Sequence, residues 1–440
     1  MAEKMRPRIY KGTRDFLPEQ MVKRNYVIDV IKKIFERYGF EPLETPTLEL
    51  WETLSGKYGE EGDRLTYRFT DRGGREVGLR YDLTVPLSRV IAMHPQLPKP
   101  FKRYQIQPVW RADKPQKGRF REFYQCDVDI VGSASMLADA EVIAVSHEVL
   151  TALNFQDFTI RINNRKVLSG IVEVCGVPDE REVDIYRAID KLDKIGFEGV
   201  EKELSKRGVE ETVVEKLFRI LSIEGNHAER ISRTADLLAK SEIGREGVAE
   251  IKTLFDFLAE YGLPENHYAF DLYLARGLDY YTGPIYETVL EKPRIGSVTG
   301  GGRYDKLIGM FSGQPHPATG SSVGLERIIT VMEEMGMFPP QLNTSTRVLV
   351  TVFDASTRSY SIRIAQTLRN AGINCDLYTG KAKLRGQFGL ANDKKIPLVI
   401  IAGPDEQAEG KAAVKNMTTG EQKTVSIDQL IDEVKGAGRT

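Results

Sequence analysis

The chain has 440 residues, of which 41% are hydrophobic and 28% charged, enough for two or three globular domains with separate cores. Its formal net charge of −1 excludes wholesale coating of nucleic acid, so any RNA contact must be regional. Apolar runs such as 398–402 are far too short to span a bilayer, and no membrane segment is predicted.

The N-terminal residues and the cysteines indicate a cytoplasmic protein without a metal centre. Residues 1–15 include acidic side chains and lack the apolar core of a signal peptide. Cys126, Cys175 and Cys375 are too far apart in sequence for a CxxC pair, which disfavours a zinc site or a disulfide scaffold. We therefore predict a cytoplasmic location and no metal-ligating residues.

The first predicted elements are a helix and an edge strand. Apolar residues recur at helical spacing over 29–38, and Gly39 is expected to end that helix. Residues 40–50 alternate in polarity, but Pro42 and Pro46 restrict this strand to a sheet edge or to an interface with a partner subunit.

A long hairpin is predicted next. Residues 101–111 and 121–130 alternate with period two around the turn-rich segment 113–119. In the second strand one face carries Arg121, Phe123, Gln125, Asp127 and Asp129. Because unpaired buried carboxylates and amides are costly, we expect this face to line a ligand pocket or, alternatively, to be exposed to solvent.

Two segments beside the hairpin carry candidate binding groups. Arg111 ends the first strand, and a guanidinium there suits a nucleotide phosphate, although a surface salt bridge is the alternative. Asp82 and Thr84 lie two residues apart on an extended segment before Pro86. They could bind an ammonium group, or Thr84 could simply be a helix N-cap.

A helical module interrupts the sheet domain. Residues 166–263 show few strand signals, whereas strand patterns resume at 270–290 and 296–305. We therefore assign 1–165 and 263–336 to one antiparallel-sheet catalytic domain and 166–262 to a helical insertion.

Three glycine-rich segments follow along the chain. In 275–283, Arg276, Tyr280 and Tyr281 offer hydroxyls and aromatic faces to a planar polar ligand. Residues 300–305 are interpreted as a glycine-rich turn, but they match neither a phosphate-binding P-loop nor a dinucleotide fingerprint.

The third segment, 320–327, is predicted to be a strand that runs into a helix. Arg327 falls in the first turn of that helix, where an arginine and the backbone amides together favour phosphate oxygens. A helix-surface ion pair with Glu326 or Glu333 is the alternative.

The C-terminal part is predicted to be a separate domain at 346–440, joined by a linker at 337–345. Apolar runs at 347–353, 373–378 and 398–402 alternate with helical patterns and indicate a small parallel sheet. Residues 345–440 contain 14 Lys and Arg against 10 Asp and Glu, a net charge of +4. This excess is either an RNA-binding surface or a solvated face.

These motifs together resemble the class II aminoacyl-tRNA synthetases, and specifically the histidyl-tRNA synthetase family, over essentially the whole chain. The hairpin 101–130 is similar to the second class motif and 320–327 to the third. Residues 276–281 and 301–305 are similar to the two segments peculiar to the histidine enzymes, and the insertion resembles their eukaryote-like form. The resemblance implies an α+β catalytic domain followed by an α/β anticodon-binding domain.

The resemblance also implies roles for individual residues. Arg276 and Arg111 would be catalytic, and Gln116 and Arg119 would contact tRNA. ATP would be bound by Arg111, Phe123 and Arg327. Histidine would be bound by a larger set: Asp82, Thr84, Arg111, Gln125, Asp129, Arg276, Tyr280 and Tyr281.

The implied activity is ATP-dependent ligation of L-histidine to tRNA(His) through a histidyl-adenylate, with ATP as substrate and Mg²⁺ on its phosphates. The family's homodimer would form around Pro46. The alternative is a catalytically silent regulatory paralogue of ATP phosphoribosyltransferase, a class that generally lacks the 276–281 segment and the anticodon domain. A class II synthetase for another amino acid is disfavoured by Tyr280 and Tyr281.

Overall fold

The computed structural model describes residues 6–178, 181–189, 191–275, 280–340 and 342–437. The chain divides into two units, one made of residues 1–15 and 27–337 and the other of residues 16–26 and 338–440. Within the described residues, no helix combines the length and the apolar character needed to cross a membrane.

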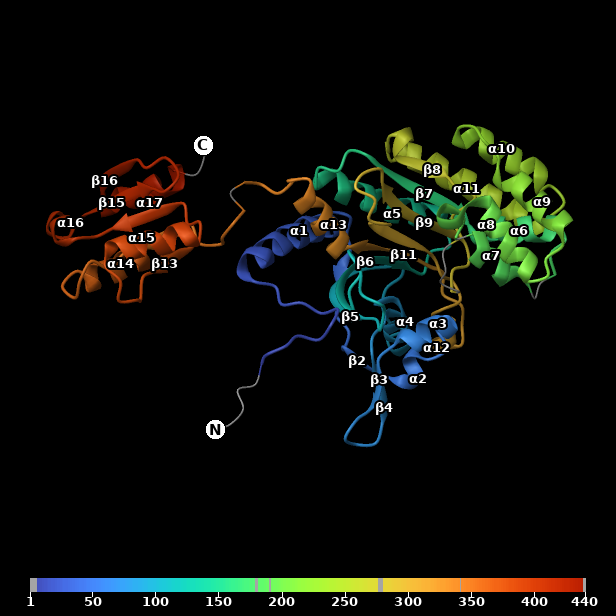
Figure 1. Cartoon of the computed structure of the whole chain (residues 1–440), viewed down its shortest axis with the longest axis horizontal. Helices are drawn as coiled ribbons and strands as arrows, with labels where there is room; N and C mark the ends of the chain where they lie inside the picture. The colour runs from blue at the N-terminus through green and yellow to red at the C-terminus, as the bar shows by residue number, and fades with distance from the viewer. Residues whose placement is uncertain (1–5, 179–180, 190, 276–279, 341, 438–440) are drawn as a thin grey trace. The chain divides into compact units, whose positions relative to one another are not determined.

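A large sheet forms the centre of the first unit (Figure 1). Its strands, in spatial order, are β1 (Glu41–Pro42), β5 (Phe101–Trp110), β6 (Glu122–Val131), β11 (Ala318–Gly324), β10 (Thr299–Arg303), β9 (Pro284–Leu290), β7 (Phe158–Asn164) and β8 (Tyr268–Phe270). Pairing is parallel only for the outermost pairs, β1 with β5 and β7 with β8. The predicted hairpin and the antiparallel sheet are therefore confirmed.

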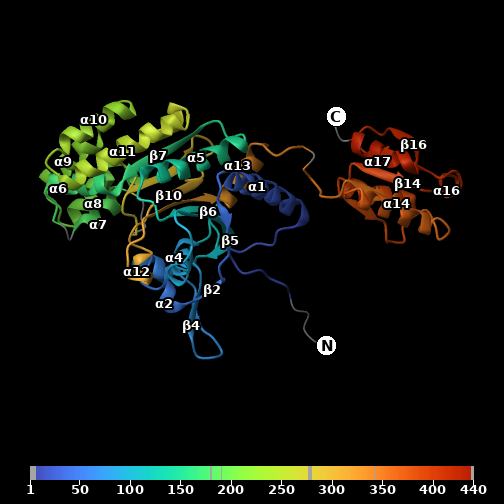
Figure 2. The same cartoon turned by 180° about the vertical axis from the view of Figure 1, so that it is seen from behind.

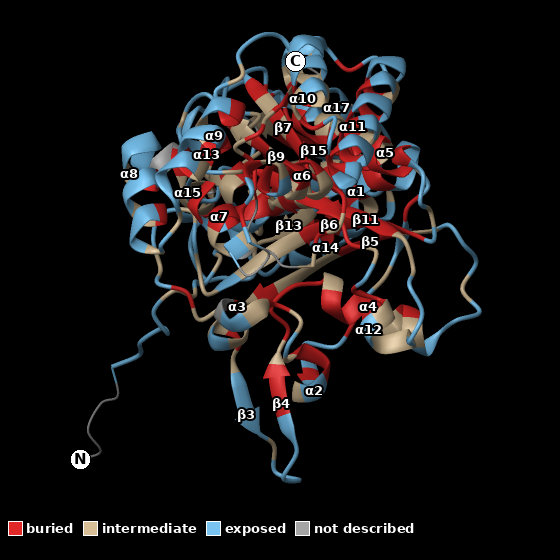
Figure 3. Cartoon of the chain, turned by 90° about the vertical axis from the view of Figure 1, so that its right-hand side faces the viewer, coloured by how far each residue is buried: buried red, intermediate tan, exposed pale blue. Residues whose placement is uncertain are grey.

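A small sheet and several helices complete the sheet part of this unit. The small sheet has the order β2 (Leu48–Leu50), β4 (Glu76–Leu79) and β3 (Arg68–Thr70). Figure 3 shows β3 exposed along its length, whereas β11 and the end of β6 are buried. The accompanying helices are α2 (Trp51–Leu54), α3 (Gly59–Leu65), α4 (Thr84–Met93), α5 (Met136–Ala152), α12 (Gly309–Ser312) and α13 (Leu325–Glu334). Helix α1 (Pro18–Arg37) is divided, with its residues from 27 onward in this unit and its earlier residues in the other.

Two predictions in the N-terminal region need correction. Helix α1 begins at Pro18, well before the predicted start at 29, because its first half is polar and gives no apolar periodicity. Proline at the first helical position was the available signal. The predicted strand 40–50 is two strands, β1 and β2, in different sheets, and each lies at the edge of its sheet, as its prolines require.

The predicted helical region is made of α6 (Arg165–Cys175), α7 (Glu182–Ile189), α8 (Leu192–Lys206), α9 (Glu211–Leu221), α10 (His227–Leu237) and α11 (Glu242–Glu260), followed by the short helix η2 (Glu265–His267). Helices α6–α10 lie together beside β7 and β8, as the front view in Figure 1 and the back view in Figure 2 show. Helix α11 packs on α6 and on α5 and so joins this region to the sheet.

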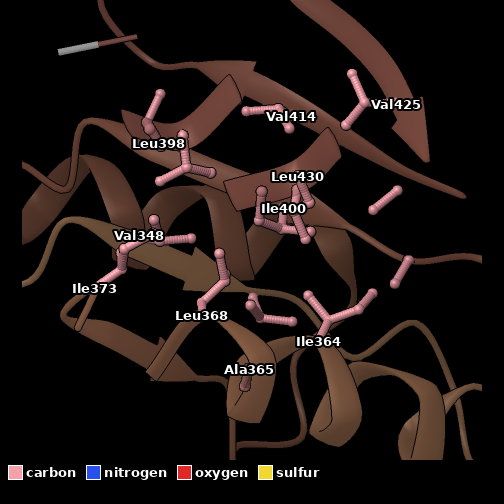
Figure 4. Packing of buried hydrophobic residues seen from close by; sticks show 14 of the residues in the cluster. Val348, Ile364, Ala365, Leu368, Ile373, Leu398, Ile400, Val414, Val425 and Leu430 are labelled. Atoms are coloured by element: carbon pink, nitrogen blue, oxygen red, sulfur yellow. The ribbon is translucent and has the colours of Figure 1, made fainter. Parts of the chain in front are cut away.

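The second unit contains a five-stranded sheet in the order β13 (Cys375–Leu377), β12 (Val348–Val350), β14 (Leu398–Ile401), β15 (Lys411–Asn416) and β16 (Gln422–Ser426). Its helices are α14 (Arg358–Asn370), α15 (Leu384–Asp393), α16 (Pro404–Glu409) and α17 (Ile427–Gly436). Figure 4 shows the apolar core of this sheet, in which Leu368, Leu398, Ile400 and Leu430 pack together.

The predicted small parallel sheet is confirmed for its three strands, but the sheet has two further strands that were not predicted. Strands β12, β13 and β14 are parallel as expected, but β15 and β16 add an antiparallel hairpin. Exposed Lys411 and Lys423 weaken the apolar alternation of these strands, so no strand was predicted there.

Candidate active site

One cavity of about 510 Å³ opens on the large sheet. Its lining comes from six separated stretches of chain: residues 81–84, the β5–β6 hairpin, residues 280–281, Glu287 of β9, residues 297–304 around β10, and β11 with the start of α13. The described residues predicted for the site that line it are Asp82, Thr84, Arg111, Arg119, Phe123, Gln125, Asp129, Tyr280, Tyr281 and Arg327. Gln116 is exposed and is not part of the lining, and Arg276 lies outside the described residues.

The pairing of β6 with β11 places the polar face of β6 in this cavity. In that register Asp127 lies opposite Ser322, and Asp129 lies opposite Gly320. A Cβ atom on Gly320 would lie 2.1 Å from Oδ1 of Asp129, so glycine is needed there to leave room for the carboxylate. The polar face therefore lines a pocket, and the alternative of a solvent-exposed face is wrong.

The sequence predicted a turn at the glycine run 300–302, and this prediction is wrong. The run is part of strand β10. A Cβ atom on Gly301 would lie 1.9 Å from the carbonyl oxygen of Gly320, and one on Gly302 would lie 2.8 Å from the ring of Tyr281. The strand therefore packs too closely against its neighbours for side chains. The turn interpretation failed because a strand made of glycine has no side-chain alternation to read.

Three buried carboxylates form the floor of the cavity, and a buried arginine supports them from behind the lining. Arg103 is fully buried, and its Nη2 lies 2.7 Å from Oδ2 of Asp129; the hydroxyl of Tyr304 donates to Oδ1 of Asp129. Burial raises the pKa of Asp82 and of Asp129. Burial also raises the pKa of Asp127 to about 7, against the opposing effect of Arg103. A floor with three carboxylates around one arginine favours a cationic ligand.

Sequence reasoning missed two partners of Asp129, Arg103 and Tyr304. A signal for Arg103 was available, because the hairpin register places it directly opposite Asp129. Tyr304 lies in the 301–305 segment that the resemblance singled out, but nothing in the sequence linked it to Asp129, which is 175 residues away.

Asp82 has one oxygen engaged and one oxygen available. Its Oδ1 accepts hydrogen bonds from the hydroxyl of Tyr58 and from the backbone N–H of Val85, both at 3.0 Å. Within the part of the chain that the structure describes, its Oδ2 and Oε1 of Gln125 are buried without a hydrogen-bond partner. Since Thr84 is the first residue of α4, the alternative that it is the N-cap is wrong; the Asp82 carboxylate receives the helix N–H.

Arg111 is held between aromatic rings at the end of β5. Its Nε donates to the carbonyl oxygen of Tyr81 at 3.0 Å. Its guanidinium carbon lies 4.2 Å from the centre of the Tyr81 ring and 5.2 Å from that of Phe123. The two rings orient the planar guanidinium at the cavity wall, as bidentate binding of an anion requires.

Arg119 and Arg327 are two further predicted residues that line the cavity. Arg119 donates two hydrogen bonds to Asp113, at 2.8 and 2.9 Å, and these fix the hairpin loop. Arg327 lies in the first turn of α13 and donates to the carbonyl oxygen of Ser297. The predicted strand-to-helix position of Arg327 is confirmed.

An antiparallel sheet with a hairpin and a strand–helix unit facing one cavity is the arrangement of a class II aminoacyl-tRNA synthetase. A family model described as histidyl-tRNA synthetase matches residues 12–328, and a model described as an anticodon binding domain matches residues 347–437. The chain therefore belongs to the histidyl-tRNA synthetase family.

Similar proteins cover nearly the whole chain. It is 44% identical to a histidine–tRNA ligase of Gloeobacter violaceus, over 94% of this chain and 96% of the relative. It is 42% identical to that of Cytophaga hutchinsonii, over 98% of this chain and 99% of the relative. The crystal structure of histidyl-tRNA synthetase from Nostoc sp. PCC 7120 superposes with a TM-score of 0.87 at 34% identity, covering 98% of this chain and all of that one.

Proposed function

We propose that this chain is a histidine–tRNA ligase, which activates L-histidine with ATP and transfers the histidyl group to tRNA(His), releasing AMP and diphosphate. One observation carries the proposal: residues from four separated segments, singled out for these ligands, line a single cavity in a chain of this family.

The carboxylate floor and the paired tyrosines form the histidine side of the cavity. The free oxygens of Asp82 and Gln125, with Thr84, accept from the α-ammonium group. Asp129, Tyr280 and Tyr281 contact the imidazole, because its two nitrogens need polar partners. The centres of the two tyrosine rings are 5.0 Å apart.

The arginines form the nucleotide side. Arg111 binds the α-phosphate, Phe123 stacks on adenine, and Arg327 binds the γ-phosphate end. The histidine carboxylate attacks the α-phosphorus in line and pyrophosphate leaves; the tRNA terminal ribose hydroxyl then attacks the adenylate. No protein nucleophile is needed, because positioning and neutralisation of charge lower the barrier. By the family resemblance, Arg276 stabilises the reacting α-phosphate.

The residues of the cavity fit a Mg²⁺ ion that arrives with ATP. Among the described residues, no three His, Cys, Asp or Glu side chains are grouped as metal ligands, but Mg²⁺ on a nucleotide needs only one or two carboxylates besides phosphate and water. Glu287 lines the cavity and accepts from Ser297 Oγ at 2.6 Å, so it is the carboxylate that would help to hold the ion. When bound, the ion neutralises the β- and γ-phosphates.

The partners of the enzyme follow from the same assignment. Gln116 and Arg119, on the hairpin loop, contact the tRNA acceptor end, and the C-terminal sheet domain reads the anticodon. The enzyme is a cytoplasmic homodimer that pairs around Pro46. Exposed Leu48, Leu50 and Phe69 on the small sheet next to Pro46 support this contact.

ATP–pyrophosphate exchange with each of the twenty amino acids tests the proposal. Exchange stimulated by histidine alone is the expected result, whereas a regulatory paralogue would show no exchange with any of them. Arg276→Ala is expected to lower the exchange rate by roughly 10²–10³-fold or more while histidine binding is partly kept. An unchanged rate in this variant would remove Arg276 from the mechanism.

A further inference from the structure

An N-terminal segment, residues 10–14, lies against the base of the β5–β6 loop; we call it the strap. The backbone N–H of Arg121 donates to the carbonyl oxygen of Gly12 at 2.8 Å, and Nη1 of Arg121 donates to that of Lys11 at 3.1 Å. Gly12 has φ +92°, and a Cβ atom there would lie 2.8 Å from Cγ of Pro115. The strap therefore needs glycine at this point, both for its backbone conformation and for its close contact with the loop.

Arg14 connects the strap to two residues of the cavity lining. Its guanidinium forms an ion pair with Glu326 and lies 3.4 Å from the centre of the Phe120 ring. Glu326 is buried, with 6% of its side chain exposed, and its Oε1 also accepts from the backbone N–H of Tyr124 at 3.5 Å. Phe120 and Glu326 both line the cavity beside Arg327.

These contacts matter because the nucleotide side of the cavity must accept a polyanion. An unpaired carboxylate at Glu326 would repel the phosphates of ATP, and in a partly buried site this repulsion is only weakly screened. The Arg14 guanidinium neutralises that carboxylate and also packs against the Phe120 ring, a contact that a planar cation makes better than an ammonium group.

We propose that Arg14 is a positioning residue for ATP, which acts from the strap through Glu326 and Phe120. The inference rests on the proposed function, because it assigns the Arg327 side of the cavity to the triphosphate. It predicts that loss of Arg14 weakens ATP use and leaves histidine use intact.

The test is histidine-dependent ATP–pyrophosphate exchange in Arg14→Ala and Arg14→Lys. Arg14→Ala is expected to raise the KM for ATP about tenfold or more, the effect of one lost charge-assisted contact, with the KM for histidine and kcat within about threefold. Arg14→Lys keeps the charge but not the planar contact, so it should restore part of the loss. Arg8→Ala, which changes an exposed arginine just before the strap, is the control and should match the wild type.

A double-variant comparison separates positioning from folding. In the Glu326→Gln background, where no carboxylate remains to be neutralised, Arg14→Ala should raise the KM for ATP by less than about threefold. An unchanged KM for ATP in an Arg14→Ala variant that exchanges would overturn the proposal, as would equal rises in both KM values. Absence of exchange in the wild type would instead refute the proposed function.

Discussion

The two main sheets of this protein bury different kinds of side chain. The interior of the C-terminal sheet is apolar, with Val348, Leu398 and Ile400 almost fully buried. The large sheet, in contrast, buries Arg103 and Asp129 where aliphatic side chains could fill the space. Buried ion pairs are a weak source of stability compared with apolar packing. The side chains in the C-terminal sheet therefore serve the stability of the fold, whereas the buried charges of the large sheet serve ligand binding.

The largest expected effect is the loss of the buried arginine. Arg103→Met should lower the free energy of unfolding by about 3–5 kcal/mol, because Asp129 is left buried without its partner. Denaturant unfolding measures this change. The matched control is Arg103→Met combined with Asp129→Asn, which removes both charges and should recover most of the loss. A loss below about 1 kcal/mol in the single variant would show that the pair behaves as an exposed one.

A void created in the core of the C-terminal sheet should lower stability without changing the activation of histidine. Leu368 is fully buried in the C-terminal core, so Leu368→Ala should destabilise that unit by about 2–5 kcal/mol. Because the ligand cavity is lined by residues of the other unit, histidine-dependent exchange should stay close to the wild-type rate under native conditions. A large loss of exchange in the folded variant would contradict the separation of roles.

A smaller effect is expected for a glycine of the cavity wall. A Cβ atom on Gly302 would lie 2.8 Å from the ring of Tyr281 and 2.8 Å from the carbonyl oxygen of Pro284. Gly302→Ala should therefore displace Tyr281 and raise the KM for histidine by about tenfold, measured by pyrophosphate exchange. Gly389→Ala is the control, since no atom lies within 4 Å of its added Cβ, and it should leave this constant unchanged.

A pH dependence of stability is expected from Asp127. Its pKa is about 7 in the folded chain because burial outweighs Arg103, against an ordinary value of 3.8. Between about pH 4 and pH 7 the unfolded chain has lost a proton that the folded chain retains, so this group reduces stability progressively as the pH rises through that window. Above pH 7 the reduction is constant.

Asp127→Asn should remove that dependence. The free energy of unfolding of the variant, relative to the wild type, is expected to increase from pH 4 to pH 7 and then level off, as followed by denaturant titrations at each pH. A difference that stays flat over the same range would mean that Asp127 is ionised in the folded chain throughout, and would contradict the prediction.

Sequence patterns predicted the elements of the cavity better than its interior contacts. Period-two alternation located the β5–β6 hairpin and the face that carries Asp127 and Asp129, because these signals are local. The ion pair of Arg14 with Glu326 joins residues 312 positions apart, and only the folded chain brings them together. The glycine strand β10 was missed for a different reason, since its structure depends on close backbone approach and leaves no side-chain pattern.

The central claim is that histidine and ATP occupy one continuous cavity on the large sheet. Titration of the purified chain with a non-hydrolysable histidyl-adenylate analogue, in the presence of bound histidine or bound ATP, tests it most directly. The account predicts one analogue molecule per chain, which displaces both ligands competitively. Retention of either histidine or ATP on the analogue-saturated protein would place the two ligands in separate sites and contradict it.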